Sequence, residues 1–262
     1  MAIAFHTNIY LPGESPIHRW ATRPKLLSLL ALMFAIALVR HLVLVPWALA
    51  IVALIYGCSR LPLTYLLRRL PYPGLFIVAM VGLLPWISGE TVIWQWQWFA
   101  LRLEGLQIAA LVAGRFLAIV ITGFILLGTT PFLDILKALR SLGLPALLTD
   151  MTLLTYRYLY DIAGQLATMQ QAMRLRGYGI FKQTVRQQWG WLGALFGSLL
   201  LRSYERSQRV YKAMCLRGYG QGMNLSNTGV SRPLNGVTRL ATSLTLVAAF
   251  SFVLGEWILS RL

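Results

Sequence analysis

The stretch LLSLLALMFAIALVRHLVLVPWALAIVALIY, from Leu26 to Tyr56, is almost continuously apolar, and it decides the class of fold. As one helix it would be about 46 Å long at ~1.5 Å per residue, well beyond the ~30 Å hydrocarbon core of a bilayer. It would also place Arg40 and His41 near the middle of the membrane, where polar side chains are costly. We therefore predict two short membrane-spanning helices that turn at Arg40 and His41.

Further apolar runs make this a polytopic membrane protein. They occur at Leu75–Ile87, Leu106–Leu127 and Val237–Leu254, so we expect about five transmembrane helices in all. Hydrophobic residues make up 57% of the chain and charged residues only 12%, about half the charged share of an average soluble domain. The mean hydropathy is +0.64. The predicted fold class is an all-α polytopic membrane protein.

The charge distribution predicts the orientation in the membrane. The chain has 24 Lys and Arg against 8 Asp and Glu, a net charge of +16. If the N-terminus is cytoplasmic, most of the basic residues fall in segments on the inner side, and only Arg40, Arg102 and Arg261 fall outside. This agrees with the positive-inside rule, and attraction to anionic lipid explains much of the surplus. We expect a multi-pass protein of the cell (inner) membrane, with the C-terminus outside.

A long polar insert divides the chain into three parts. We expect the first four transmembrane helices in residues 1–128, a cytoplasmic helical insert in residues 129–236 and the fifth transmembrane helix in residues 237–262. Within the insert, one long helix opens at Pro145 and runs to Arg176. A second begins near Thr184 and runs to Arg217. Each has about thirty residues and a length of about 45–50 Å.

An octapeptide occurs twice in the insert, at the end of each long helix. AMRLRGYG occupies Ala172–Gly179, and AMCLRGYG occupies Ala213–Gly220, with Arg174 against Cys215 as the one difference. An arginine in the last turn followed by glycine is typical of an ordinary helix C-terminus. Capping alone, however, does not require the Ala-Met before the arginine or the Tyr and second Gly after it. The repetition therefore indicates a further role.

We interpret that role as docking of both helix ends on another protein. The alanines keep the last turn slim, the glycines remove bulk at the tip, and each arginine offers charge-assisted hydrogen bonds worth about 1.5–3 kcal/mol. Two equal tips predict two equal grooves, and hence a dimeric or pseudo-dimeric partner. The candidate docking residues are Ala172, Arg176, Gly177, Ala213, Arg217 and Gly218.

Four other arginines are candidates for supporting contacts. Arg202, Arg206 and Arg209 share one stripe of the second long helix. Arg115 falls inside the fourth span and would cost roughly 2.5–3.5 kcal/mol if it faced lipid. We expect it to reach a subunit interface, Glu104, backbone carbonyls or the membrane surface.

The densest resemblance to a known family lies in Thr129–Gly220. The signatures MRLRGYG and MCLRGYG, together with RSYERSQRVYKAM, TTPFLDILKALRSLGLP, LLTYRYLY and the earlier HRWATRPKLL, resemble the transmembrane coupling (T) component of energy-coupling factor (ECF) transporters. The resemblance is to the cobalt/nickel type, CbiQ. The family motif is often Ala-Arg-Gly, and here Leu175 and Leu216 stand in the alanine place.

The resemblance implies a coupling subunit without catalytic activity. The two long helices would be coupling helices whose Arg176 and Arg217 dock on two ATP-binding cassette ATPase subunits, while a separate membrane subunit binds cobalt or nickel. No glycine precedes a lysine, so the sequence has no P-loop, and we expect ATP to be bound and hydrolysed by the partners. The histidines and cysteines have no metal-ligand spacing. We therefore expect no enzyme activity, metal site or cofactor in this chain.

Three other functions are open at this point. Within the same class, the chain could be the shared T component of a vitamin importer. It could instead be a stand-alone channel or membrane enzyme, although it lacks a nucleophile–base pair. Finally, the basic insert could bind a lipid surface or nucleic acid, in which case scattered arginines would contribute about equally and affinity would fall steeply with salt. The coupling hypothesis predicts instead that Arg176 and Arg217 dominate, with the lipid bilayer and no nucleic acid as further partners.

Overall fold

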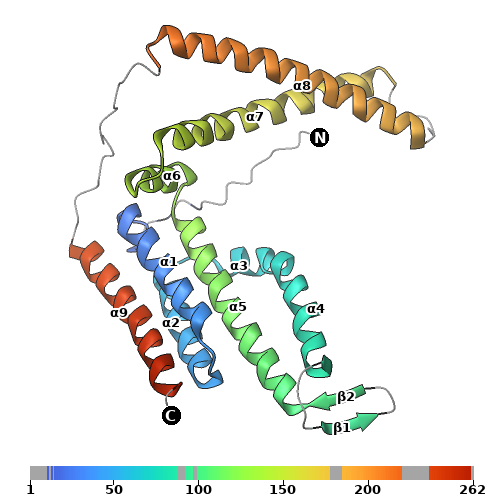
Figure 1. Ribbon diagram of the computed structural model, residues 1–262. Coiled ribbons are helices and arrows are strands. Elements are labelled where there is room, and N and C mark those ends of the chain that lie inside the picture. The colour runs from blue at the N-terminus through green and yellow to red at the C-terminus, as the bar shows by residue number, and fades with distance from the viewer. Residues whose placement is uncertain are drawn as a thin grey trace. The chain divides into compact units, whose positions relative to one another are not determined.

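The computed structural model describes residues 11, 13, 15–87, 92–96, 99–177, 185–219 and 236–260. The chain divides into two compact units (Figure 1). The helix-pair unit contains α7 (Ala146–Leu175) and α8 (Val185–Leu216). The membrane unit contains a two-stranded hairpin, the 3-10 helix η1 (Leu42–Leu44) and the helices α1 (Thr22–Leu38), α2 (Val45–Ser59), α3 (Leu63–Arg69), α4 (Pro71–Ile87), α5 (Leu103–Thr129), α6 (Phe132–Ser141) and α9 (Gly236–Leu259).

The described helices confirm a polytopic membrane protein. Three segments are long and apolar enough to cross a membrane, at Leu42–Ser59, Glu104–Thr129 and Thr238–Ile258. A fourth results if α3 and α4, bent by 56° at their junction, are counted as one broken span. The fifth expected span depends on α1, whose 17 residues lie at the short end of the range for a membrane-crossing helix.

The predicted turn at Arg40 and His41 is confirmed. Helix α1 ends at Leu38, and η1 and α2 follow from Leu42 onward. Glu256 of α9 holds this turn, because its carboxylate accepts a hydrogen bond from the Arg40 backbone N–H at 3.0 Å and lies 3.8 Å from His41 Nε2. The break in the long apolar stretch is therefore fixed by a contact from the last helix of the chain.

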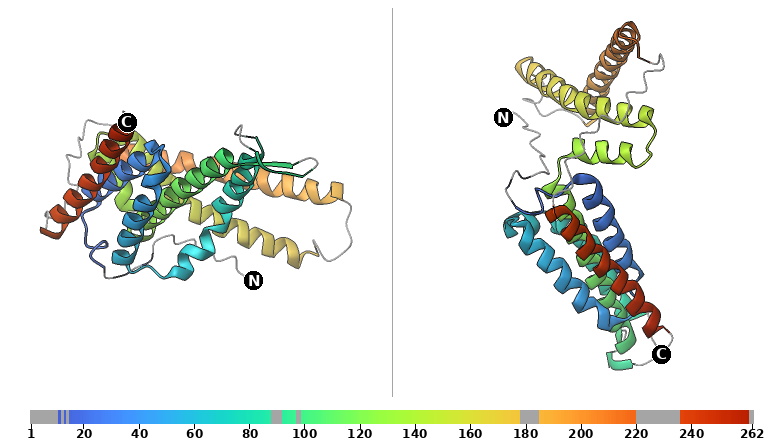
Figure 2. Two further views of the ribbon diagram at one scale, coloured as in Figure 1. Left: turned by 90° about the horizontal axis from the view of Figure 1, so that it is seen from below. Right: turned by 90° about the vertical axis from the view of Figure 1, so that its left-hand side faces the viewer.

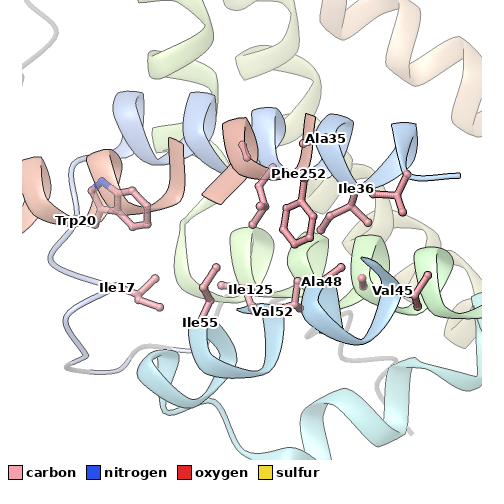
Figure 3. Packing of buried hydrophobic residues seen from close by; sticks show 14 residues of the cluster. Ile17, Trp20, Ala35, Ile36, Val45, Ala48, Val52, Ile55, Ile125 and Phe252 are labelled. Carbon is pink, nitrogen blue, oxygen red and sulfur yellow. The ribbon is translucent and has the colours of Figure 1, made fainter. Parts of the chain in front are cut away.

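The core of the membrane unit lies between α1, α2, α5 and α9, which pack side by side (Figure 2). Phe252 of α9 and Ile36 of α1 point toward α2 and α5, where they meet Val52 and Ile125 (Figure 3). Gly114 allows α5 to approach α2 closely, since a Cβ at this position would overlap Val45 Cγ1. The apolar runs thus supply an internal core as well as lipid-facing surface.

A short antiparallel hairpin adds strands that the all-α prediction did not include. It consists of β1 (Val92–Trp96) and β2 (Phe99–Arg102), with Trp96 opposite Phe99 and Gln95 opposite Ala100. The polar and aromatic residues of β1 alternate, which is the period of a strand and not of a helix. The hairpin links α4 to α5 and leaves the helical architecture intact.

The two compact units divide at Gly143, where the backbone takes a positive φ of 108° between α6 and α7. Helix α6 therefore belongs to the membrane unit, although residues 129–236 were predicted to form the insert. In the helix-pair unit, α7 has 30 residues and α8 has 32, which agrees with the predicted length of about thirty residues for each long helix. They run antiparallel and cross (Figure 1), so their C-terminal ends lie at opposite ends of the pair.

Candidate functional site: two matching helix ends

The end of α7 is built by the first octapeptide. The N–H of Arg176 points back to the carbonyls of Ala172 and Met173, at 3.2 and 3.1 Å. The N–H of Gly177 donates to the Arg174 carbonyl at 3.0 Å, and Gly177 has φ 84°. A residue in the left-handed region just after the last helical turn is the usual way to close an α-helix. Arg176 is therefore the capping position, with its side chain exposed.

The end of α8 repeats this geometry. Gly218 has φ 81°, and its N–H donates to the Cys215 carbonyl at 3.0 Å. The Tyr219 N–H donates to the Met214 carbonyl, also at 3.0 Å. These two bonds together form a Schellman motif, in which the two residues after the cap satisfy carbonyls of the last turn. Arg217 occupies the same position as Arg176 in the first copy.

The cap of α8 places the methionine and the tyrosine of its octapeptide beside one cavity. A Schellman motif is often accompanied by an apolar contact between the residue three positions before the cap and the second residue after it. In α8 these residues are Met214 and Tyr219, and both line one cavity between the two helices. The methionine and tyrosine of the second octapeptide thus lie beside the cavity at the helix crossing, as well as in the cap. Capping still does not account for the alanine, the leucine and the outward arginine.

The pattern of side-chain exposure is the same in the described part of the two octapeptides, as is the positive φ of Gly177 and Gly218. In both copies the alanine, leucine and arginine are exposed, whereas the methionine and glycine are half-buried. Neither glycine is needed for space, because a Cβ on Gly177 or Gly218 would meet nothing within 4 Å. Their role is the positive φ. The six candidate docking residues thus form two matching sets, one at each end of the helix pair: Ala172, Arg176 and Gly177 on α7, and Ala213, Arg217 and Gly218 on α8.

The candidate supporting arginines have different interaction partners. Arg206 Nη1 lies 3.4 Å from Asp161 Oδ2 of α7, and Arg209 Nη1 lies 3.9 Å from Glu205 Oε2 one turn earlier. These two side chains therefore have acidic partners within the helix pair. Arg115 lies in the membrane unit, where its Nη2 donates to the Ala37 carbonyl in the last turn of α1.

Arg202 is the supporting arginine that the structure brings near a helix end. It lines a hollow of about 340 Å³ together with Arg176, Ala172 and residues of the first half of α8. The opposite end has a different neighbour, because the Tyr219 hydroxyl donates to Asp150 Oδ2 of α7 at 3.4 Å. Sequence reasoning missed both neighbourhoods, since the helix crossing that creates them leaves no periodic signal in the sequence.

The described residues offer no clustered metal ligands at these ends. They contain no group of three or more His, Cys, Asp and Glu side chains that could hold a metal ion. Cys215, at the position where the octapeptides differ, hydrogen-bonds with Tyr211 and thereby raises the pKa of that tyrosine. The ends of α7 and α8 can present two similar surfaces, each cationic and partly apolar, to another molecule.

Comparison with known proteins places these ends in a transport context. The protein family described as cobalt transport protein, CbiQ, matches residues 13–229. Nickel permease LarQ of Lactiplantibacillus plantarum is 33% identical over 217 residues, which cover 80% of this chain and 70% of that protein. The energy-coupling factor transporter transmembrane protein EcfT of Brevibacillus brevis is 28% identical over 229 residues, covering 82% and 84%. The cobalt transport protein CbiQ of Rhodobacter capsulatus is 32% identical over 122 residues, covering 46% and 47%. The family match includes both octapeptides.

Proposed function

The chain belongs to the CbiQ family of cobalt transport proteins, and from this membership we propose that it is the transmembrane coupling component of an ATP-driven ECF importer. In this role it joins two ATPase subunits to a membrane subunit that binds the substrate. The chain itself is a multi-pass membrane component and not an enzyme. Similarity to EcfT over most of both chains supports this assignment.

The observation that carries the proposal is the matching pair of helix ends. Two ends that share seven of eight octapeptide residues, the positive φ of the first glycine and the pattern of exposure suit two copies of one docking surface. Each end offers an exposed guanidinium, Arg176 or Arg217, that can donate several hydrogen bonds to a carboxylate of an ATPase subunit. ATP binding and hydrolysis belong to those subunits, and this chain requires no cofactor for its role.

Motion of the ATPase subunits is transmitted through the rigid helices α7 and α8. Each is long enough to span about 45–50 Å, so a displacement at a helix end is carried along the whole helix as a rigid body. The helix-pair unit and the N-terminus lie on the cytoplasmic side, because the basic residues concentrate there. The C-terminus lies outside, and the membrane is the cell (inner) membrane.

The proposed substrate is cobalt or nickel. Two of the similar proteins are named as a nickel permease and a cobalt transport protein. Because the described residues hold no metal-binding group, the ion is bound by the partner subunit in this proposal. The similarity to EcfT supports a second candidate in the same class, a shared T component of a vitamin importer.

Affinity purification from the native host in mild detergent tests the proposal. Wild-type chain should co-purify with ATP-binding cassette ATPase subunits and a substrate-binding membrane subunit, and mass spectrometry of the latter identifies the substrate class. The Arg176→Glu/Arg217→Glu variant should lose the ATPases.

The matched control is Arg157→Glu/Lys212→Glu, which makes the same change of charge at one exposed basic residue on each helix, outside the candidate site. It should retain the ATPases. Equal loss in both double variants would indicate a generally basic, lipid- or nucleic-acid-binding surface and would overturn the docking role. Full retention in the Arg176/Arg217 variant would show that the octapeptides serve only as caps.

A further inference from the structure

The leucine that precedes each docking arginine is unusually exposed. Leu175 and Leu216 are each 90% exposed, which is the highest value among the large hydrophobic side chains that the structure describes. A single exposed leucine is ordinary on a protein surface. Here, however, the same position of two repeated octapeptides shows the same exposure in two different helical surroundings. The equal exposure of Leu175 and Leu216 therefore needs an explanation that applies to both helix ends.

Helix capping does not supply one. The cap bonds involve the carbonyls of Ala172, Met173 and Arg174 in α7 and of Met214 and Cys215 in α8, and Met214 and Tyr219 line the cavity at the helix crossing. Each leucine is 90% exposed, so it stabilises neither the cap nor the crossing of α7 and α8. In a free helix end it would only expose apolar surface to water.

The neighbours of each leucine make it a projecting group. The alanine three residues earlier, Ala172 or Ala213, lies on the same face of the helix and is itself exposed. The glycine after the arginine has open space around it. Each leucine therefore projects above a low surface, one residue before the exposed Arg176 or Arg217. An apolar knob next to a cation suits a socket with apolar walls and an acid at its rim.

We infer that Leu175 and Leu216 are matched apolar anchors, each of which enters a socket on one of two ATPase subunits of the same kind. The inference rests on the proposed function, and it adds a specificity-determining residue to each docking end. In this arrangement an acidic residue at the rim of the socket orients the arginine. The leucine contributes binding energy by burying apolar area in the socket, and this contribution depends on the fit of the two shapes and not on charge. Two equal anchors require two equal sockets, which selects a pair of identical or closely similar ATPases.

The test is a binding titration of the full chain in lipid nanodiscs with the purified ATPase pair that co-purifies with it. Leu175→Ala/Leu216→Ala should raise the dissociation constant at least about tenfold, because truncation removes most of each anchor. Leu175→Met/Leu216→Met should bind within about threefold of wild type, since methionine keeps the volume and apolar character. Raising the salt concentration should weaken wild type and the Leu→Ala variant by the same factor.

The control variant is Leu159→Ala/Leu200→Ala, which removes one exposed leucine from the middle of each long helix. These side chains are 60% and 73% exposed, so the variant loses similar apolar surface away from the ends. It should bind as wild type does. A Leu175/Leu216 variant that binds like this control would overturn the anchor role.

The same titration separates the two hypotheses. If Arg176→Ala/Arg217→Ala weakens binding while Leu175→Ala/Leu216→Ala does not, docking stands and the leucine anchors are rejected. If neither variant weakens binding, the docking function itself is rejected. All substituted side chains are exposed, and size-exclusion chromatography with circular dichroism confirms that each variant is folded before binding is compared.

Discussion

Gly177 and Gly218 show how a single residue fixes the backbone geometry of each proposed docking end. Both adopt a positive φ, and alanine in this conformation costs about 1–2 kcal/mol. We predict that Gly177→Ala/Gly218→Ala frays both helix ends and weakens recovery of the ATPase subunits. The measurement is hydrogen exchange at the Gly218 and Tyr219 amides, whose bonds close the α8 end, together with co-purification.

Asparagine at the same two positions is the control, because it tolerates the left-handed region better than alanine. Gly177→Asn/Gly218→Asn should restore most of the amide protection. Since a Cβ has open space at both positions, equal loss in the two variants would mean that size and not backbone conformation matters. The role given to the positive φ would then be wrong.

At the scale of single residues, the sequence predicted the charges and the caps but not the direction of side chains. Arg-Gly at a helix end has a local physical reason, and both copies adopt the expected cap. The exposure of Leu175 and Leu216 was not predicted, because it depends on which face each helix turns toward its partner. The contact between Tyr219 and Asp150 depends on the same crossing.

Among the elements, the junction of α1 with α5 depends on a buried lysine. Lys25 is 1% exposed and lies just before the apolar run of α1. Its Nζ donates to the Ile17 carbonyl at 3.0 Å, to Thr129 Oγ1 at 2.6 Å and to the Thr129 carbonyl at 3.4 Å. It thus holds the N-terminal segment to the end of α5, from which α6 continues. In the sequence, Lys25 reads only as one more cytoplasmic positive charge.

Burial lowers the pKa of Lys25 from 10.5 to about 7, which predicts a pH dependence of stability. Between pH 7 and 10.5 the unfolded chain binds a proton that the folded chain has lost, so the free energy of unfolding rises with pH. From pH 7 to 9 this group should add about 2 kcal/mol. Thermal unfolding in detergent at a series of pH values measures the effect.

The control for this dependence is Lys25→Met, which keeps an apolar side chain of similar length and cannot titrate. Its melting temperature should change less between pH 7 and 9 than that of wild type. A wild-type protein whose stability is flat or falls over this range would contradict a lowered pKa for Lys25. The same would follow if the Lys25→Met variant kept the full rise.

Close packing of α5 against α2 yields a prediction about another element. Gly114 faces Val45, and a side chain there would overlap Val45 Cγ1. We predict that Gly114→Val destabilises the membrane unit by about 1–3 kcal/mol, because the helices must move apart. Gly82→Val in α4 is the control, since a Cβ there meets nothing within 4 Å. Thermal melts in detergent compare the two, and equal losses would contradict a specific contact at Gly114.

Hydropathy and periodicity predicted most elements because each apolar run is long compared with a helical turn. They did not predict the hairpin β1–β2, whose strands are short and separate two helices. They also missed the break between α3 and α4. Helix α6 packs on α1, and such a contact between distant residues has no signature in the local sequence.

For the whole molecule, the important property is that one chain carries two matching helix ends, the proposed docking ends, at opposite ends of a crossed helix pair. A ligand that engages both gains from the high effective concentration of the second end, often about 10²–10⁴ in affinity. We predict that Arg176→Ala and Arg217→Ala, made singly, each weaken binding of the ATPase pair to nanodisc-embedded chain by about a hundredfold or more. Each should leave a residual affinity, which the double variant loses. If one single variant binds as wild type does and the other as weakly as the double, the chain docks through one end, and its duplicated octapeptide would not reflect a duplicated partner.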